Sequence, residues 1–202
     1  MIDPSNITNY NRTDKELEEF LLFCIFTAGK KATEAATKLE KFLCLLDPFR
    51  HEDDHSYFCP IIRLIQENRG TAKIEELLRE ARTGKYNLLT RAIDDIANVI
   101  WCGTTLNELS VEDLEMVTGI GPKTARFFLL HSRPKVRAAV LDVHILKWLK
   151  QFYPDTPKQT PHAKYYGKHE KRFLKLAKRK FKGKTIAEID LDIWKSYSKV
   201  GA

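Results

Sequence analysis

The residues best suited to covalent chemistry are Lys123 and Asp142, which lie 19 positions apart. Lys123 follows a proline that suits the first position of a helix, so its amine is expected in the first helical turn. The positive end of the helix dipole there favours the neutral amine, which is the nucleophilic form. Asp142 precedes another expected helix, where a capping carboxylate stays ionised, keeps a fixed direction and can stabilise a cation. A surface or phosphate-binding lysine and a purely structural cap are the alternative interpretations.

A glycine turn comes directly before this lysine, in the segment Val117-Thr118-Gly119-Ile120-Gly121-Pro122. Two glycines at alternate positions allow positive φ and let a ligand approach the backbone closely. Their N–H groups, together with those that open the next helix, are expected to form a nest for one phosphate. Ile120 is expected to pack into the core of the two flanking helices. The pattern favours a helix–hairpin–helix motif over an ordinary helical corner.

The net charge of +7 is distributed unevenly along the chain. Residues 147–184 contain 13 Lys and Arg against Asp155 and Glu170, a local net charge of +11 that leaves −4 for the remainder. Clustered cations gain affinity for nucleic acid by releasing its condensed counterions. Aromatic residues interleave with these cations, so we favour a nucleic-acid surface over a solvated helix face; they are Tyr153, Tyr165, Tyr166 and Phe173.

The elements that must position these groups are almost all helical by pattern. Apolar periodicity and capping residues predict helices near 14–28, 33–46, 59–68, 72–82, 88–101, 111–116, 122–132, 143–151, 161–181 and 191–198. Only 136–141 could be extended. We therefore expect an all-α fold in two helical parts, with the active site in the cleft between them. One part is expected over 33–132, and the other is expected to combine 1–32 with 133–202.

Composition and cysteine spacing exclude several classes of protein. The N-terminus lacks the pattern of a signal peptide, and its longest apolar run, 20–26, is too short for a membrane span. Cysteines at 24, 44, 59 and 102 form no CxxC pair, so no metal or iron–sulfur site is expected. The sequence has no heptad repeat of apolar residues of the kind that predicts a coiled coil. These features predict a monomer in the cytoplasm, associated with the nucleoid if the source is prokaryotic, with no cofactor and no membrane partner.

With these residues in place, a family resemblance becomes specific. The stretch GIGPKTA…LDVHILKWL resembles the helix–hairpin–helix DNA glycosylase superfamily. The outer pieces, FLLFCIFTAGKKATEAATKLEKFL and AEIDLDIWKSY, are most similar to the compact archaeal and bacterial 8-oxoguanine glycosylase/AP lyases. The four-cysteine cluster of endonuclease III and the adenine glycosylases is absent from the sequence. The chain also departs from the pattern at Gly29-Lys30, where many relatives carry Asn or Gln.

The resemblance implies a bifunctional repair enzyme that acts on double-stranded DNA containing a damaged base. The base is flipped out of the duplex, Lys123 attacks the sugar C1′, and Asp142 stabilises the developing oxocarbenium ion. The Schiff base then undergoes β-elimination, which nicks the strand without metal or cofactor. Further site residues are implied in two groups: DNA anchors at Thr118, Gly119, Ile120 and Gly121, and base-recognition residues at Asp190 and Trp194.

Two other functions stay open at this point. A glycosylase for another lesion, such as an oxidised pyrimidine or a mismatched thymine, would carry the same lysine and aspartate. A DNA-binding module without catalysis would share the hairpin and the basic segment, but it would need neither Lys123 nor Asp142. Trp194 also has a purely structural interpretation as a core residue.

Overall fold

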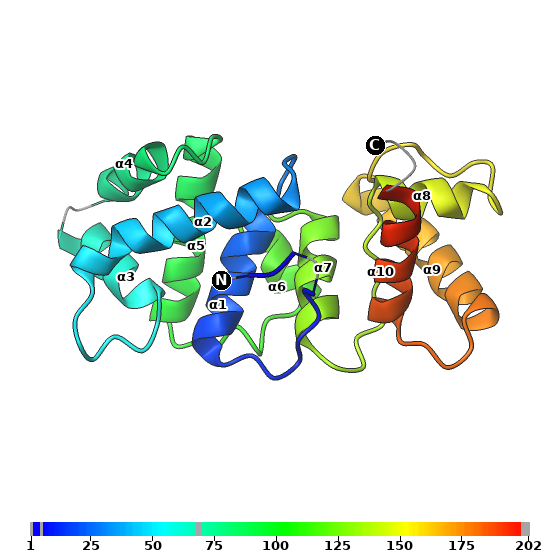
Figure 1. Ribbon diagram of the computed structural model, residues 1–202, viewed down its shortest axis with the longest axis horizontal. Helices are drawn as coiled ribbons and strands as arrows, with labels where there is room; N and C mark the ends of the chain where they lie inside the picture. The colour runs from blue at the N-terminus through cyan, green and yellow to red at the C-terminus, as the bar shows by residue number, and fades with distance from the viewer. Residues whose placement is uncertain (1, 5, 68–69, 199–202) are drawn as a thin grey trace. The chain divides into compact units, whose positions relative to one another are not determined.

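The computed structural model describes residues 2–4, 6–67 and 70–198, and all the regular secondary structure in these ranges is helical. No β-strand occurs in these ranges, so the predicted all-α class is confirmed. The elements in order are α1 (Asp14–Phe26), α2 (Ala32–Leu46), the 3-10 helix η1 (Asp47–Phe49), α3 (Phe58–Glu67), α4 (Ala72–Glu80), α5 (Tyr86–Trp101), α6 (Val111–Met116), α7 (Pro122–Ser132), α8 (Val143–Lys150), α9 (Ala163–Lys180) and α10 (Ile186–Ser198) (Figure 1).

Capping boxes stand at the starts of α1 and α10. At α1, the Thr13 hydroxyl accepts from the Glu16 N–H, and the Glu16 carboxylate accepts from the Thr13 N–H, which completes a capping box. The same exchange joins Thr185 and Glu188. Because α10 follows this box directly, it begins at Ile186, five residues earlier than predicted.

Contacts divide the chain into two compact units whose boundary lies inside the glycine turn. The N-terminal unit comprises Met1–Ile7 and Asn11–Ile120, and the C-terminal unit comprises Thr8–Tyr10 and Gly121–Ala202. This division differs from the one expected from sequence, which put 1–32 with the C-terminal part and α7 with the other. Helix α1 belongs to the N-terminal unit because it packs against α2 and α5 there.

The N-terminal unit is built around α1, whose centre is apolar on every face. Phe20, Leu21 and Leu22 are fully buried, and α2 and α5 lie alongside this helix (blue, with α2 and α5 as neighbours in Figure 1). The rings of Phe26 and Phe42 meet at 5.8 Å between α1 and α2. A helix buried on all sides forms the core of its unit rather than an edge.

The C-terminal unit is centred on α10, which contacts α7, α8 and α9. A shared core joins the last three helices, and Trp148 of α8 meets Phe173 of α9 edge-to-face at 5.7 Å. Tyr166 of α9 and Ile193 of α10 are buried in the same core. The unit therefore fixes the starts of α7 and α8, which carry Lys123 and Asp142, against one helix.

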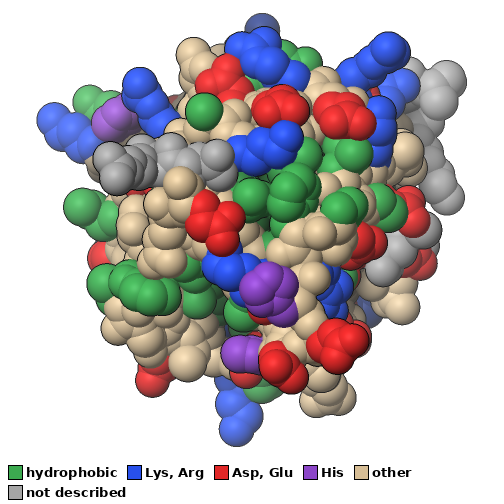
Figure 2. Space-filling model, turned by 90° about the vertical axis from the view of Figure 1, so that its left-hand side faces the viewer, with side chains coloured by type: hydrophobic (Ala, Val, Ile, Leu, Met, Phe, Trp, Pro, Cys, Tyr) green, Lys and Arg blue, Asp and Glu red, His purple; other side chains and the backbone are tan. Residues whose placement is uncertain are grey.

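The surface of the N-terminal unit differs in charge pattern from the basic segment 147–184. Figure 2 views the end of this unit that carries α3 and α4, and acidic, basic and hydrophobic side chains are interspersed over it. Such a mixed face creates no large field of one sign. Throughout the described ranges, every helix is too short or too polar to cross a bilayer.

Candidate active site

The glycine turn is held by its own backbone and by one carboxylate of α5. The Thr118 N–H donates to Asp95 Oδ2 at 2.8 Å, and the Ile120 N–H donates to the Val117 carbonyl at 3.0 Å. Ile120 is buried, as predicted for the residue that pins the turn. Gly119 has φ +81°, and a Cβ at this position would lie 3.1 Å from the Leu88 side chain, so the turn requires glycine there.

Two backbone amides of the turn are open to a ligand. Those of Gly119 and Gly121 donate to no group among the described residues, whereas those of Thr118 and Ile120 are already used. Gly121 has an ordinary φ of −93° and occupies the N-cap of α7. The expectation of positive φ at both glycines therefore holds for Gly119 alone, because Gly121 already has the extended backbone of a helix N-cap.

Lys123 lies in the first turn of α7, directly after Pro122 at the start of that helix. Its side chain is exposed, and its ammonium group makes no hydrogen bond or ion pair with any described residue. A lysine that is not committed to a structural contact is available to a substrate. The helical start predicted from Pro122 is confirmed.

Asp142 is the N-cap of α8, as its position in the sequence predicts. Its Oδ1 accepts from the backbone N–H groups of His144 at 2.9 Å and Ile145 at 2.8 Å. Its Oδ2 accepts no hydrogen bond within the described part of the chain. One oxygen thus fixes the direction of the half-buried carboxylate, and the other is left for a ligand.

The extended segment that carries Asp142 is held by side chains of α9. The Tyr166 hydroxyl accepts from the Leu141 N–H at 2.9 Å and donates to the Ala139 carbonyl at 2.7 Å. Glu170 Oε1 accepts from the Ala139 N–H at 3.0 Å and also from Arg126 Nε of α7 at 2.8 Å. Because the segment pairs with no strand in the described structure, these side chains supply its backbone hydrogen bonds.

Asp190 of α10 is a buried carboxyl group, only 5% exposed, whose electrostatic environment includes both candidate catalytic residues. Burial raises the pKa of Asp190. His131, whose Nε2 lies 3.4 Å from Asp190 Oδ2, and the positive charge of Lys123 oppose that rise. The negative charge of Asp142 adds to it. Its Oδ1 has no hydrogen-bond partner among the described residues. The C-terminal unit therefore brings both Lys123 and Asp142 within electrostatic reach of Asp190.

Trp194 is on the surface of the C-terminal unit, one helical turn after Asp190. It is 38% exposed, and its ring meets that of His144 edge-on at 6.2 Å between centroids. The interpretation of Trp194 as a core residue is therefore wrong. An exposed indole next to the helix that Asp142 caps offers a flat apolar face to a ligand.

The basic helix α9 has two faces with different roles. Tyr166 and Phe173 are buried in the core, so the expectation that they interleave with cations at the surface is wrong. Tyr165 is 58% exposed and does lie among the charges. Six exposed cations of α9 have no acidic partner in the described structure: Lys164, Lys171, Lys175, Lys178, Arg179 and Lys180.

His131, Tyr166 and Glu170 are site residues that the sequence interpretation missed. His131 is fully buried on the apolar face of α7, three residues after the buried Phe128. A polar residue at an apolar helical position is a signal that was available in the sequence. The partner of such a residue lies far along the chain, and spacing alone cannot identify it.

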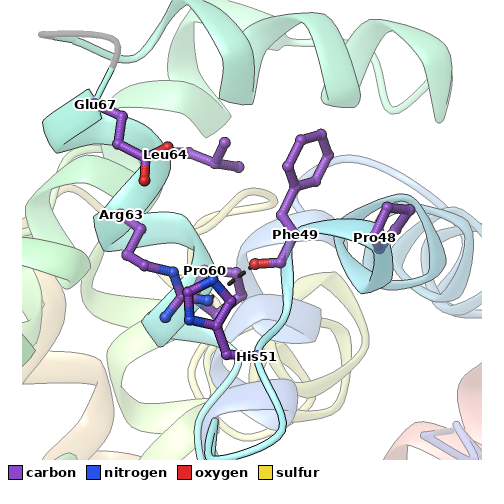
Figure 3. A pocket seen from close by; sticks show the side chains of 7 residues that line it. All are labelled: Pro48, Phe49, His51, Pro60, Arg63, Leu64 and Glu67. Carbon is purple, nitrogen blue, oxygen red and sulfur yellow. Dashed lines mark hydrogen bonds between the residues drawn. The ribbon is translucent and has the colours of Figure 1, made fainter.

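A pocket in the N-terminal unit has no part in this arrangement. It measures about 200 Å³ and is lined by Pro48, Phe49, His51, Pro60, Arg63, Leu64 and Glu67 (Figure 3). The Arg63 guanidinium in this pocket is already hydrogen-bonded within the protein, because it donates to the Phe49 carbonyl at 2.9 Å and to both carboxylate oxygens of Asp54. In the described residues no three His, Cys, Asp or Glu side chains gather as metal ligands.

Tyr166→Phe should destabilise the protein by about 1–3 kcal/mol, because it leaves the buried Leu141 N–H and Ala139 carbonyl without their shared partner. Urea unfolding measures the free energy. The matched control is Tyr165→Phe, which removes a hydroxyl from an exposed ring and should change stability by less than about 0.5 kcal/mol. Equal losses in the two variants would contradict the role given to the Tyr166 hydroxyl.

No family model and no curated protein matches this chain. The site residues, their contacts and their charges therefore have to support any assignment of function.

Proposed function

We propose that this chain is a bifunctional DNA glycosylase/AP lyase that removes 8-oxoguanine through a Schiff base on Lys123. The observation that carries the proposal is the grouping of an uncommitted lysine at a helix start, a capped carboxylate and a buried carboxyl group in one unit. A DNA-binding module without catalysis has no need of this grouping. The proposal includes the two-part helical glycosylase fold with a helix–hairpin–helix motif.

In the proposed reaction, the neutral amine of Lys123 forms a bond to C1′ of the extruded nucleotide. The bond from C1′ to the base breaks, and the base leaves with the bonding electrons and takes up a proton. Asp142 stabilises the positive charge that develops on the sugar, since Oδ2 is open while Oδ1 is held by the helix start. Ring opening gives the Schiff base, a proton leaves C2′, and the C3′–O bond breaks with the phosphate as leaving group.

DNA is held, in this proposal, by two features of different character. The open N–H groups of Gly119 and Gly121 donate hydrogen bonds to phosphate oxygens, and the exposed cations of α9 supply a field that does not depend on sequence. Thr118 and Ile120 act by shaping the turn, because their own amides are bonded within the protein.

Base recognition is assigned to Asp190 and Trp194, one turn apart on α10. The unpartnered Oδ1 of Asp190 suits an N–H group of the base edge, and the exposed Trp194 ring suits stacking. An oxidised pyrimidine also presents N–H groups, so a glycosylase for another lesion is the second candidate.

Lys123→Gln should lower covalent trapping by borohydride on an 8-oxoguanine duplex at least ~100-fold, because an amide cannot form a Schiff base. The control, Lys31→Gln, removes the same charge from an exposed position before α2, outside the groups assigned to catalysis and DNA binding, and should trap as the wild type does. The assay is run on duplexes with 8-oxoguanine, an oxidised pyrimidine, a mismatched thymine and an abasic site. If the wild type prefers another duplex, the proposed substrate is wrong and that lesion replaces it. Normal trapping by Lys123→Gln would refute the assignment of Lys123 as the nucleophile. Binding without trapping by the wild type would indicate a non-catalytic module.

Asp142→Asn should slow single-turnover base excision by about 10²–10³-fold while the DNA Kd stays within about twofold. Asparagine is also a good N-cap, so the start of α8 is kept and only the charge is lost. Thermal unfolding verifies that the fold is intact. Parallel losses of excision and binding would show that Asp142 is a structural cap only.

Alanine substitutions at the two glycines of the turn distinguish a role in folding from a role in phosphate binding. Gly121→Ala should fold normally, since the added Cβ meets no atom within 4 Å, yet it should weaken DNA binding about 10-fold by blocking close approach to the amide. Gly119→Ala should lose about 1–2 kcal/mol of stability, because φ is +81° and Leu88 is in contact. Wild-type affinity in Gly121→Ala, measured by fluorescence anisotropy, would exclude its amide from the phosphate site.

A further inference from the structure

A short N-terminal strap, Thr8–Tyr10, belongs to the C-terminal unit although the residues on both sides of it belong to the other. The Asn9 N–H donates to the backbone carbonyl of His131 at 3.1 Å. The Thr8 hydroxyl lies 2.8 Å from His131 Nδ1. Tyr10 interacts with Thr185 and Glu188 at the start of α10. The strap thus reaches both helices that carry the buried His131 and Asp190 pair.

The polar side chains of Thr8, His131 and Asp190 lie one against the next, with His131 in the middle. His131 is 0% exposed, and its ring also meets Phe127 edge-on at 4.9 Å. Its second nitrogen, Nε2, lies 3.4 Å from Asp190 Oδ2.

The neighbours decide which nitrogen of His131 carries the proton. With Asp190 ionised, its carboxylate can only accept, and Nε2, which faces it, is then the protonated nitrogen. Nδ1 is then an acceptor, and the Thr8 hydroxyl donates to it. Thr8 is thereby bonded to Nδ1, and the approach of Nε2 to 3.4 Å holds the Oδ2 side of the carboxylate, with Oδ1 unpartnered among the described residues.

The Asp190 Oδ1 has practically no accessible surface in this structure, so a ligand reaches it only when the surrounding side chains move, and an unpartnered buried carboxylate oxygen is costly unless a ligand uses it. We propose that Thr8 and His131 are positioning residues that fix the Asp190 carboxylate so that its Oδ1 serves the substrate bound beside Lys123 and Asp142. This inference rests on the proposed function and adds to it a requirement for the N-terminal strap. Residues that orient a ligand-binding group through a hydrogen bond typically change activity 10–100-fold when removed.

The experiment compares Thr8→Val, which keeps the shape and removes the hydroxyl, with Thr8→Ser, which restores it. Nitrogen-15 NMR spectra of the histidine rings report the protonated nitrogen of His131 without reference to activity. Single-turnover excision of 8-oxoguanine and the DNA Kd are measured on the same samples. In the wild type and Thr8→Ser, His131 should be protonated on Nε2. Thr8→Val should shift the Nδ1 signal and excise about 10-fold more slowly at unchanged Kd.

Each other outcome has a defined meaning. A Thr8→Val protein with an unchanged His131 spectrum and rate overturns the inference, and so does a Thr8→Ser protein as slow as Thr8→Val. A wild-type protein protonated on Nδ1 also overturns it, even if that protein traps DNA. If the wild type excises no lesion, the proposed function fails, and the positioning role in catalysis fails with it. The spectra then still determine whether Thr8 sets the proton of His131.

Discussion

The candidate site depends on hydrogen bonds from Tyr166 and Glu170 of α9 to the segment that carries Asp142. The segment before α8 is extended and has no strand beside it in the described structure, so its polar backbone must be satisfied by side chains. The buried Tyr166 hydroxyl accepts from the Leu141 N–H and donates to the Ala139 carbonyl, and Glu170 accepts from the Ala139 N–H. Because Glu170 also binds Arg126, the same carboxylate links the segment to α7. The starts of both helices that carry the candidate catalytic groups depend on these contacts.

Helix α9 consequently has two functions within one sequence pattern. Its apolar face and its two polar contacts hold the site, and its opposite face presents cations to the solvent. A mutation on the inner face acts through geometry, whereas one on the outer face acts through the electrostatic field. The division explains why a segment so rich in lysine is still an integral part of a hydrophobic core.

Local features were predictable from the sequence, and features that need two distant segments were not. The cap at Asp142 follows from short-range hydrogen bonds and is confirmed. Helix α5 begins at Tyr86, two residues before the predicted start at 88, and follows Lys85 in the left-handed region. The roles of Tyr166 and His131 depend on contacts 25 and 123 residues away, which no periodicity encodes. The division into units differed for the same reason, since it follows from packing.

Because of the strap, the C-terminal unit is not one continuous stretch of the sequence. Three residues near the beginning of the chain complete a unit whose other members start at Gly121. That unit has a discontinuous topology, and its contacts with the strap are of very long sequence separation. A fragment that begins at Gly121 would lack the hydroxyl that faces His131. Synthesis of α10 must be finished before the first residues of the chain can reach all of their partners, so this region is expected to mature last in folding.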